Sequence, residues 1–490
     1  EIHGEFLKGE RKGLEQATGV FCGVNYNKKT KKLILFTDKL GVRPLYYYKK
    51  GNVIVFSTIF NYFQRLSFVD NAENFQGLCE IIAFKYCLAE RTSMQYVSLL
   101  QASEIIEINN FLCKSDIYWD WGMIPLSIEP YSKQVEQIYS TFQDAVLRRL
   151  GNEKNAVAFL SGGMDSRCIA STVREKVDNL YTFNFSINNS QDKVFAKHFS
   201  HCLGSKHFEI VFKKLAFPNF SQLIAKAWKD VYKGMKNQPK YNRFVWSGDG
   251  GSVSIGHIYI DKSMVDFLEN KQERMAVEHY MKFNRIVEPI NILSKKHSEK
   301  ARNIVARSIE EEIDKINCTE QGRRIYFFLM FNDQHRHLNM HFETIGQHKT
   351  ELLLPFFDSK LIQQIVSLPI EKCLFHEFYS DWFALFPENV RQVPWQTYPG
   401  HKKCPVKINE NLSYQWDESV VEKVEERRKI NDDVKYLLGL FWSGEFPQHI
   451  LNRKKYFIAL ILHWFKVRDY SYFIGIVKRV VDNYHLNKQG

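Results

Sequence analysis

The sequence has no paired cysteines, no long apolar run and no strong excess of one charge. Its nine cysteines stand singly, with no Cys-x-x-Cys pair, which argues against a disulfide framework or a structural zinc and favours a cytoplasmic protein. The net charge of +12 comes from 67 basic and 55 acidic residues, so we expect no nucleic-acid partner. Proline is scarce, at 13 residues, while 44% of residues are apolar, which is typical of a globular protein.

The longest apolar run, residues 456–465, contains one histidine, His463. It is about half the roughly 20 residues that a membrane-spanning helix needs, so it predicts a buried helix and no membrane partner. The chain opens with Glu1 instead of methionine, and no signal peptide precedes the first predicted strand. We therefore expect the natural N-terminus to be missing, through processing or because the sequence is a fragment.

The N-terminal part of the chain predicts β-structure. Residues 1–66 contain two hairpins, with apolar segments at 20–26, 33–37, 45–48 and 53–57. Residues 67–130 predict a connector with a helix at 74–88, an extended stretch at 104–108 and an aromatic loop at 118–121.

From residue 131 to residue 490 the pattern changes to an α/β domain. Predicted strands lie at residues 156–160, 180–185 and 207–211. They alternate with predicted helices at residues 135–150, from the glycine turn through residue 173, and at residues 193–203. Strands that alternate with helices indicate right-handed βαβ units and a parallel sheet. Beyond residue 265 the sequence pattern predicts helices almost throughout. The expected fold class is thus α/β and α+β, with a β-rich N-terminal domain before a parallel-sheet domain whose C-terminal part is mostly helical.

The strongest motif lies at the end of the first predicted strand of this domain. It reads Phe159-Leu160-Ser161-Gly162-Gly163-Met164-Asp165-Ser166 and opens a helix. Glycines let a backbone approach an anion closely, and the first N–H groups of a helix favour negative charge. Ser161 and Ser166 add hydroxyl donors. Asp165 would repel a phosphate unless it holds a Mg²⁺ ion that bridges phosphate oxygens, so the motif predicts a phosphate site with Asp165 as metal ligand.

Residues 161–166 resemble the pyrophosphate loop of the ATP pyrophosphatase superfamily, whose members cleave ATP between its α- and β-phosphates. The motif lacks the Lys-Ser/Thr ending of a Walker A loop, so transfer of the γ-phosphate is less expected. The segment Trp246-Ser247-Gly248-Asp249-Gly250-Gly251 resembles the second catalytic loop of the asparagine synthetase family. The resemblance implies that Asp249 is a catalytic acidic residue and that Ser247 and Gly248 lie against the nucleotide. By the same resemblance, Phe159, Leu160 and Phe185 line the adenine and ribose pocket.

Residues 37–47 resemble a segment of the class II glutamine amidotransferase domains of the asparagine synthetase type, an Ntn-type fold. The resemblance makes residues 1–66 an incomplete domain of this kind. In that family the glutaminase nucleophile is an N-terminal cysteine, and Glu1 cannot fill this role. The chain begins past the point where the glutamine-binding segments would lie. Cys22 is interpreted as a small buried hydrophobic residue.

Two departures concern the synthetase site. Ser252 stands where the family has a second Mg²⁺-ligating aspartate, so the metal is expected to depend on Asp165 and the ATP phosphates. The family also places a charge-stabilising lysine in a stretch that corresponds to residues 394–405. Lys402 or Lys403 could fill that role, and a solvated basic loop is an equally good interpretation.

Three histidines form a polar stripe, His335, His337 and His341. His337 and His341 have the spacing of metal ligands on a helix, but packing or a substrate contact is the favoured interpretation.

Together these features predict an ATP-dependent ligase of the asparagine synthase (glutamine-hydrolysing) type. It would adenylate a carboxylate, aspartate or another acid, and form an amide with nitrogen from glutamine or ammonia, with ATP and Mg²⁺ as cofactors. The sequence leaves open whether the protein forms a homodimer. The alternatives are a glutamine-independent synthetase that resembles β-lactam synthetase and a non-catalytic nucleotide-binding homologue. A tRNA-modifying pyrophosphatase is disfavoured by the amidotransferase-like domain.

Overall fold

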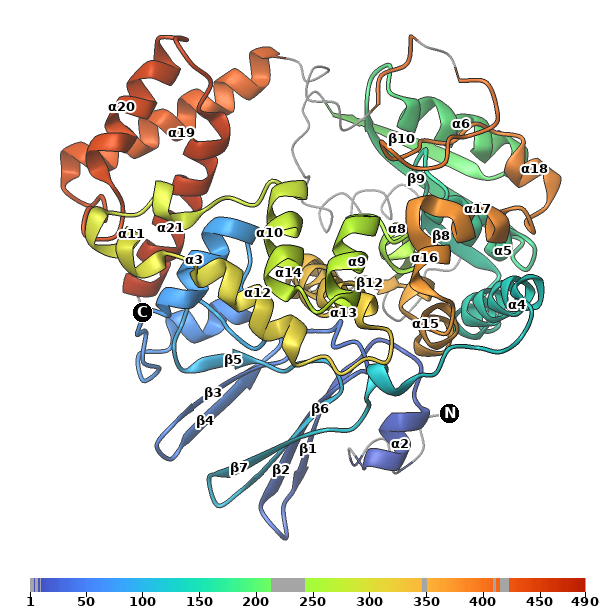
Figure 1. Ribbon diagram of the computed structural model, residues 1–490, viewed down its shortest axis with the longest axis horizontal. Coiled ribbons are helices and arrows are strands. Elements are labelled where there is room, and N and C mark those ends of the chain that lie inside the picture. The colour runs from blue at the N-terminus through green and yellow to red at the C-terminus, as the bar shows by residue number, and fades with distance from the viewer. Residues whose placement is uncertain are drawn as a thin grey trace.

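The computed structural model describes residues 4, 8, 10–212, 243–345, 350–408, 411–414 and 423–489. Figure 1 shows three groups of elements: antiparallel strands at the bottom, a parallel sheet with its helices at the upper right, and three C-terminal helices at the upper left.

Two antiparallel sheets form the N-terminal part, next to helices α2 (Arg11–Gln16) and α3 (Phe75–Phe84). One sheet has the order β1-β2-β6-β7, with strands Cys22–Asn27, Lys32–Thr37, Glu104–Asn109 and Leu112–Ile117. The other has the order β4-β3-β5, with strands Val53–Ser57, Tyr46–Lys50 and Val97–Leu99. The predicted hairpins and the extended stretch are confirmed. Strands β5, β6 and β7 come from the segment predicted as a connector, and they join the sheets of the hairpins. The boundaries at residues 66 and 130 stay predictions.

The parallel sheet has the order β10-β9-β8-β11-β12. Its strands are β8 (Asn155–Phe159), β9 (Asn179–Ile187), β10 (Lys206–Phe212), β11 (Arg243–Trp246) and β12 (Thr350–Leu353). In β8 the residues Ala156, Val157 and Ala158 are all buried, as expected of a strand covered on both faces. Helices α5 (Asp165–Arg174) and α6 (Gln191–Leu203) pack on these strands, and α4 (Tyr131–Leu150) packs on α5. The predicted parallel α/β architecture is confirmed.

Helices make up most of the remaining described residues, as predicted. They are α8 (Gly251–Ser254), α9 (Lys262–Glu269), α10 (Glu273–Phe283), α11 (Lys295–Ala301), α12 (Ile304–Asp314), α13 (Arg324–Phe328), α14 (His335–Ile345), α15 (Ser359–Val366), α16 (Ile370–Cys373), α17 (Glu377–Phe383) and α18 (Glu388–Arg391). The four-residue strand β12 was not predicted, because it is too short to show a pattern against its helical neighbours.

Side chains at and just before β3 connect the N-terminal sheets to strand β12 and helix α14. The Arg43 guanidinium lies 2.5 and 2.6 Å from the two carboxylate oxygens of Glu351 on the edge strand β12. The Tyr46 hydroxyl donates to the Glu343 carboxylate at 2.7 Å. The two parts of the chain therefore share an ion pair and a hydrogen bond between partly buried groups.

The C-terminal helices are α19 (Lys423–Ser443), α20 (Arg453–Trp464) and α21 (Ser471–Gln489), and α21 packs on α3. The helix predicted at residues 456–465 is confirmed, but its prediction as a buried helix is wrong. Tyr456 and Leu460 are buried, whereas Phe457 and Ile458 on the opposite face are exposed, because α20 packs against the molecule on one side only. None of the helices in the described ranges is both long and apolar enough to cross a membrane.

Candidate active site

Two loops meet where the order of strands reverses across the parallel sheet. From β8 the chain builds β9 and β10 on one side, while β11 and β12 lie on the other. Such a switch point leaves a crevice at the carboxyl ends of two neighbouring strands, which is where open α/β sheets bind ligands. Residues 160–164 follow β8 and residues 247–250 follow β11. Both loops predicted from the sequence therefore lie at this crevice.

Glycines allow the two loops to touch. A Cβ atom on Gly248 would lie 2.8 Å from the backbone nitrogen of Ser166, and one on Gly251 would lie 2.6 Å from the carboxylate carbon of Asp165. Real Cβ atoms do not approach other heavy atoms that closely, so any larger residue at either position would push the loops apart. The Gly248–Asp249–Gly250–Gly251 segment thus packs directly on the start of α5.

The Asp165 carboxylate is the centre of this contact. Its Oδ2 accepts hydrogen bonds from the Ser252 backbone N–H at 3.0 Å and from the Ser252 hydroxyl at 2.6 Å. Its Oδ1 accepts a hydrogen bond from the Tyr379 hydroxyl of α17. Burial raises the pKa of Asp165, the three hydrogen bonds oppose that shift, and the negative charge of Asp249 adds to it. Ser252, which the sequence resemblance places at the position of the family's second aspartate, is therefore in direct contact with the predicted metal ligand.

The serines of the first loop bond to each other. The Ser161 N–H donates to the Ser166 hydroxyl oxygen at 2.9 Å, the two hydroxyl oxygens are 3.0 Å apart, and the Gly163 N–H donates to the Ser161 hydroxyl oxygen at 3.2 Å. Only one of the two hydroxyl protons can lie between the two oxygens. The other is directed elsewhere, so the pair can still donate to a ligand.

Gly162 joins the loop to the start of α6. Its N–H donates to the Asp192 carboxylate at 2.8 Å, and a Cβ atom on Gly162 would lie 2.6 Å from the Cα of Asp192. The other Asp192 oxygen accepts from the Asn184 amide at 2.7 Å. Burial raises the pKa of Asp192 to about 6, against the opposing effect of these two donors. Asp192 is a site residue that the sequence reasoning missed, although it follows the carboxyl end of β9 at the same edge of the sheet.

Of the three residues predicted to line a nucleotide pocket, two meet. The Phe159 and Phe185 rings pack edge to face with centroids 5.3 Å apart, and both are half-buried. The Leu160 side chain is fully buried in the core, while its carbonyl accepts a hydrogen bond from Asn184 at 2.9 Å. Leu160 can therefore contribute through its backbone, and the two phenylalanines offer an aromatic surface at the ends of β8 and β9.

Asp249 is held by its own loop. The Ser247 hydroxyl donates to the Asp249 carboxylate at 2.6 Å, and the Asp249 N–H donates to the Ser247 hydroxyl oxygen at 3.3 Å. Helix α14 supplies a histidine near this group: burial lowers the pKa of His341, and the negative charge of Asp249 opposes that shift. The charge of Asp249 therefore acts on His341, which comes from a distant segment of the chain.

The other histidines of the predicted stripe differ in environment. His335 is buried and its Nδ1 lies 3.3 Å from the Phe331 carbonyl, whereas the His337 and His341 rings pack with centroids 5.6 Å apart. Within the described part of the chain, no three His, Cys, Asp or Glu side chains converge in a way that could hold a metal ion. The interpretation of this stripe as packing or a substrate contact stays a prediction.

Lys402 and Lys403 lie on the segment that follows α18. The Lys402 ammonium is 3.4 Å from the Glu377 carboxylate and 3.9 Å from that of Asp381, both on α17. The Lys402 backbone N–H donates to the Phe375 carbonyl at 3.0 Å, and the Lys403 side chain is exposed. Lys402 thus binds the same helix that carries Tyr379.

A buried arginine ties the phosphate loop to residues 390–396 and was missed from the sequence. The Arg167 guanidinium donates to the carbonyls of Gly163 at 3.2 Å, Val393 at 2.6 Å and Pro394 at 2.9 Å. The Gln396 N–H donates to the Gly162 carbonyl at 2.9 Å. Burial lowers the pKa of Arg167 to about 10, so the guanidinium remains charged directly behind the loop.

A strained backbone segment supports Tyr379. Phe375 and His376 have φ angles of 53° and 64°, which are unfavourable for side-chain-bearing residues. The His376 ring is buried and packs on the rings of His401 and Tyr379 with centroids 4.5 and 5.4 Å away. Burial lowers the pKa of His376 to about 3, so a neutral imidazole lies behind the tyrosine that binds Asp165.

In the N-terminal sheets, Cys22 behaves as the sequence indicated. Its thiol is half-buried on β1 and donates to the Pro44 carbonyl at 3.5 Å. Burial raises the pKa of Cys22 to about 12, so the group is a protonated thiol and a poor nucleophile.

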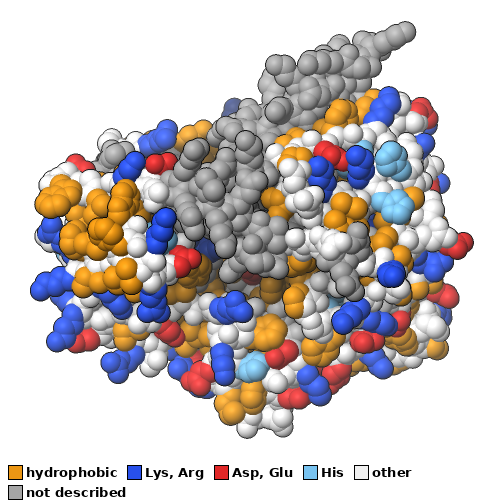
Figure 2. Space-filling model, turned by 90° about the horizontal axis from the view of Figure 1, so that it is seen from above, with side chains coloured by type: hydrophobic (Ala, Val, Ile, Leu, Met, Phe, Trp, Pro, Cys, Tyr) orange, Lys and Arg blue, Asp and Glu red, His pale blue; other side chains and the backbone are white. Residues whose placement is uncertain are grey.

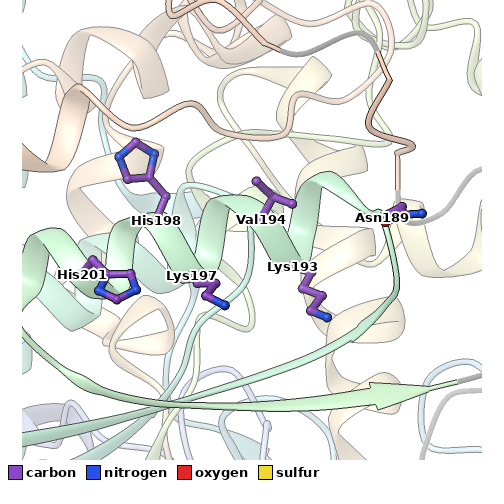
Figure 3. A pocket seen from close by; sticks show the side chains of 6 residues that line it. All are labelled: Asn189, Lys193, Val194, Lys197, His198 and His201. Carbon is purple, nitrogen blue, oxygen red and sulfur yellow. The ribbon is translucent and has the colours of Figure 1, made fainter.

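A separate hollow of about 450 Å³ lies on the surface of α6 (Figure 3). Lys193 and Lys197 project from the same side of the helix, and each ammonium lies 3.4 Å from the Glu209 carboxylate of β10. The hollow is lined by Asn189, Lys193, Val194, Lys197, His198 and His201. None of these residues belongs to the two loops.

The structure thus belongs to a class of proteins that combine antiparallel N-terminal sheets with a parallel sheet that carries a glycine-rich loop at its switch point. Comparison with known proteins agrees with this division. A family model described as a glutamine amidotransferase domain matches residues 5–119, and one described as asparagine synthase matches residues 137–241.

Curated proteins that resemble the chain are named asparagine synthetases. The chain is 24% identical to the glutamine-hydrolyzing asparagine synthetase of Homo sapiens over 335 residues, 64% of this chain and 52% of the human protein. It is 28% identical to that of Mesocricetus auratus over 163 residues, 29% of each chain. The two domain matches and these relatives show that the chain is similar to the asparagine synthetase family, at low identity. It spans about half the length of the first curated relatives that it matches.

Proposed function

We propose that the chain is an ATP-dependent carbon–nitrogen ligase of the asparagine synthase (glutamine-hydrolysing) type that works in the cytoplasm. The observation that carries this proposal is the meeting of the two loops, with Asp165 and Asp249, at the switch point of a parallel sheet. The aromatic pair Phe159 and Phe185 supports a nucleotide base at the same edge. The names of the family matches supply the reaction type.

The reaction has two steps. An acceptor carboxylate oxygen attacks the α-phosphorus of ATP, the bond between the α- and β-phosphates breaks, and pyrophosphate leaves. A nitrogen nucleophile then attacks the carbonyl carbon of the acyl-adenylate, loses a proton and expels AMP. The acceptor is aspartate or another carboxylate, and the nitrogen comes from glutamine or ammonia.

We assign pyrophosphate binding to residues 161–166. Because the Ser161 and Gly162 N–H groups are used inside the protein, the available donors are the hydroxyl pair of Ser161 and Ser166 and the N–H groups of the first turn of α5. The charge of Arg167 behind the loop favours a polyanion further. Gly163 keeps the loop surface open, Ser247 and Gly248 border the nucleotide, and Asp249 contacts the activated substrate or the amine.

The donor set fits a Mg²⁺ ion that is shared with ATP. Mg²⁺ is usually held by one or two carboxylates together with substrate phosphates, and Asp165 supplies one such carboxylate beside the phosphate loop. Each Asp165 oxygen keeps lone-pair capacity beyond its bonds to Ser252 and Tyr379. When bound there, the ion would neutralise charge on the leaving pyrophosphate. In this proposal Asp165 orients the ion, and Lys402 or Lys403 offsets charge on the acyl side.

Pyrophosphate release by the purified chain tests the proposal. The assay combines ATP and Mg²⁺ with a panel of carboxylates, and each mixture is run with glutamine, with an ammonium salt and without a nitrogen source. We expect acceptor-dependent AMP and pyrophosphate in equal amounts. If the reaction proceeds with an ammonium salt but not with glutamine, this chain carries out the amide-forming reaction without glutamine hydrolysis. Absence of ATP cleavage with every acceptor would overturn the proposal.

A homodimer and the absence of a nucleic-acid partner belong to the same proposal. Light scattering after size exclusion tests the first, and a gel-shift assay with RNA and DNA tests the second.

A further inference from the structure

Helix α20 has two apolar faces, and only one of them is covered. Tyr456, Ala459 and Leu460 face inward and are buried. The outward face is formed by residues that recur at positions i, i+1, i+4, i+7 and i+8 along the helix, namely Phe457, Ile458, Ile461, Trp464 and Phe465. Figure 2 shows hydrophobic side chains gathered at the end of the molecule where α19 and α20 lie.

The exposure on this face is large for side chains of this kind. Ile458 is 57% exposed, Phe465 is 72% exposed and Val467, just past the helix, is 70% exposed. Trp442, at the end of α19, is 82% exposed. The Arg453 guanidinium of α20 donates to the carbonyl of the neighbouring Phe441, which places Trp442 next to the start of α20. Exposed apolar side chains gathered in this way indicate an interaction site. We name it the α20 face.

Basic residues stand at both ends of the α20 face. Arg453, Lys454 and Lys455 begin the helix, and Lys466 and Arg468 follow its end; all five are exposed. Two copies of the chain that met along α20 would bring basic ends together in either a parallel or an antiparallel arrangement. Like charges repel, so this charge pattern disfavours a second copy and favours an anionic partner.

We propose that the α20 face binds the surface of an anionic lipid bilayer. Aromatic and aliphatic side chains on one helix face, flanked by lysines and arginines, are the composition of helices that lie in a membrane interface. Phe457, Ile458, Ile461, Trp464 and Phe465 enter the headgroup region, while Lys454, Lys466 and Arg468 contact lipid phosphates. The cytoplasmic leaflet of a cell membrane carries the negative charge that this pattern needs. The proposal departs from the sequence-based expectation of no membrane partner and does not depend on the proposed reaction.

Vesicle sedimentation with the full chain tests the proposal. The probes are phosphatidylcholine vesicles with and without phosphatidylglycerol. We expect binding only to the anionic vesicles, and weaker binding as salt is added. Lys454→Glu combined with Lys466→Glu should weaken binding at least about tenfold, because each basic residue near an anionic surface contributes roughly a fivefold change. The matched charge control is Lys28→Glu with Lys29→Glu, two exposed lysines in the turn before β2, and should bind as the wild type does.

The apolar contribution is tested with Ile458→Ser combined with Phe465→Ser, which should abolish most binding while the thermal unfolding temperature stays near that of the wild type. Phe111→Ser with Leu112→Ser, on the exposed β6–β7 hairpin, is the matched apolar control. Equal binding by the Ile458/Phe465 variant and the wild type would overturn the proposal. Absence of binding of the wild type to anionic vesicles would overturn it as well. A dimer in light scattering that these same substitutions dissociate would assign the α20 face to a second copy and would also overturn it.

Discussion

The Ser252 hydroxyl lies 2.6 Å from Oδ2 of Asp165, and its backbone N–H donates to the same oxygen. Ser252 stands where the sequence resemblance implies a second aspartate. Its two hydrogen bonds thus support the carboxylate of Asp165. A hydroxyl stabilises a buried carboxylate without adding charge, so this arrangement keeps Asp165 in place before any ligand binds.

Replacing Ser252 should change how the fold responds to Mg²⁺. In Ser252→Asp, two carboxylates would face each other in a partly buried place, so we expect a lower melting temperature without metal and a larger rise on addition of Mg²⁺ than in the wild type. In Ser252→Ala, loss of the hydroxyl should cost roughly 1–3 kcal/mol of unfolding free energy without increasing the Mg²⁺ response. Thermal unfolding with and without MgCl₂ checks both. An Asp variant no more responsive than the wild type would argue against a cation at Asp165.

Tyr379 should contribute to stability through its hydrogen bond with Asp165. Tyr379→Phe removes one donor from a charged acceptor, which should lower the unfolding free energy in urea by about 1.5–3 kcal/mol. Tyr62→Phe, at an exposed tyrosine of the N-terminal part, is the matched control and should be nearly neutral. Equal stability of the two variants would show that the hydroxyl of Tyr379 does not hold Asp165.

The neighbouring glycines of the phosphate loop should respond differently to the same substitution. Gly162→Ala would place a Cβ atom 2.6 Å from the Asp192 Cα, so the loop must shift and ATP affinity should fall at least about tenfold. Gly163→Ala meets only the Ser161 hydroxyl, at 3.4 Å, and should bind ATP nearly as well as the wild type. Titration with a fluorescent ATP analogue checks the pair. Similar losses in both variants would contradict the contact with α6.

The contribution of Asp192 to the free energy of unfolding should decrease as pH rises from about 4 to 7. Its pKa is about 6 in the folded chain against an ordinary value of 3.8, so the folded state binds the proton more tightly than the unfolded state. The stabilisation is complete below pH 4 and is lost as pH rises through 6, by about 3 kcal/mol.

Asp192→Asn removes this titration. The variant also loses one of the two acceptor oxygens, but that cost is the same at every pH. Urea unfolding of both proteins at several pH values should therefore give curves that approach each other, or cross, as pH rises. Parallel curves would contradict a raised pKa of Asp192 in the folded chain.

Local patterns were sufficient for the two hairpins, for β8, β9 and β10 and for the first loop, whereas β11 and β12 were not predicted and the second loop was found through its resemblance to a family motif. The strand β8 and its following glycines are adjacent in the sequence, and alternating strands and helices imply the parallel sheet that puts both loops at one edge. The partners of these loops were not predictable in the same way. Asp165 and Tyr379 are 214 positions apart, and Arg167 binds carbonyls more than 220 positions away. Such contacts depend on how helices pack, which periodicity does not encode. The exposed face of α20 was missed because a run that is apolar all round gives no indication of which face is covered.

The central claim is that Asp165 and its loop hold ATP for cleavage between the α- and β-phosphates. The most direct measurement is acceptor-dependent release of pyrophosphate by the wild type, Asp165→Asn and Asp178→Asn, the last being an exposed aspartate of the same domain. We predict that the wild type and Asp178→Asn release pyrophosphate at similar rates, each with an equal amount of AMP. The rate of release by Asp165→Asn should be lower by at least about a hundredfold. Unchanged release by Asp165→Asn, or ADP and phosphate as the products, would contradict the account.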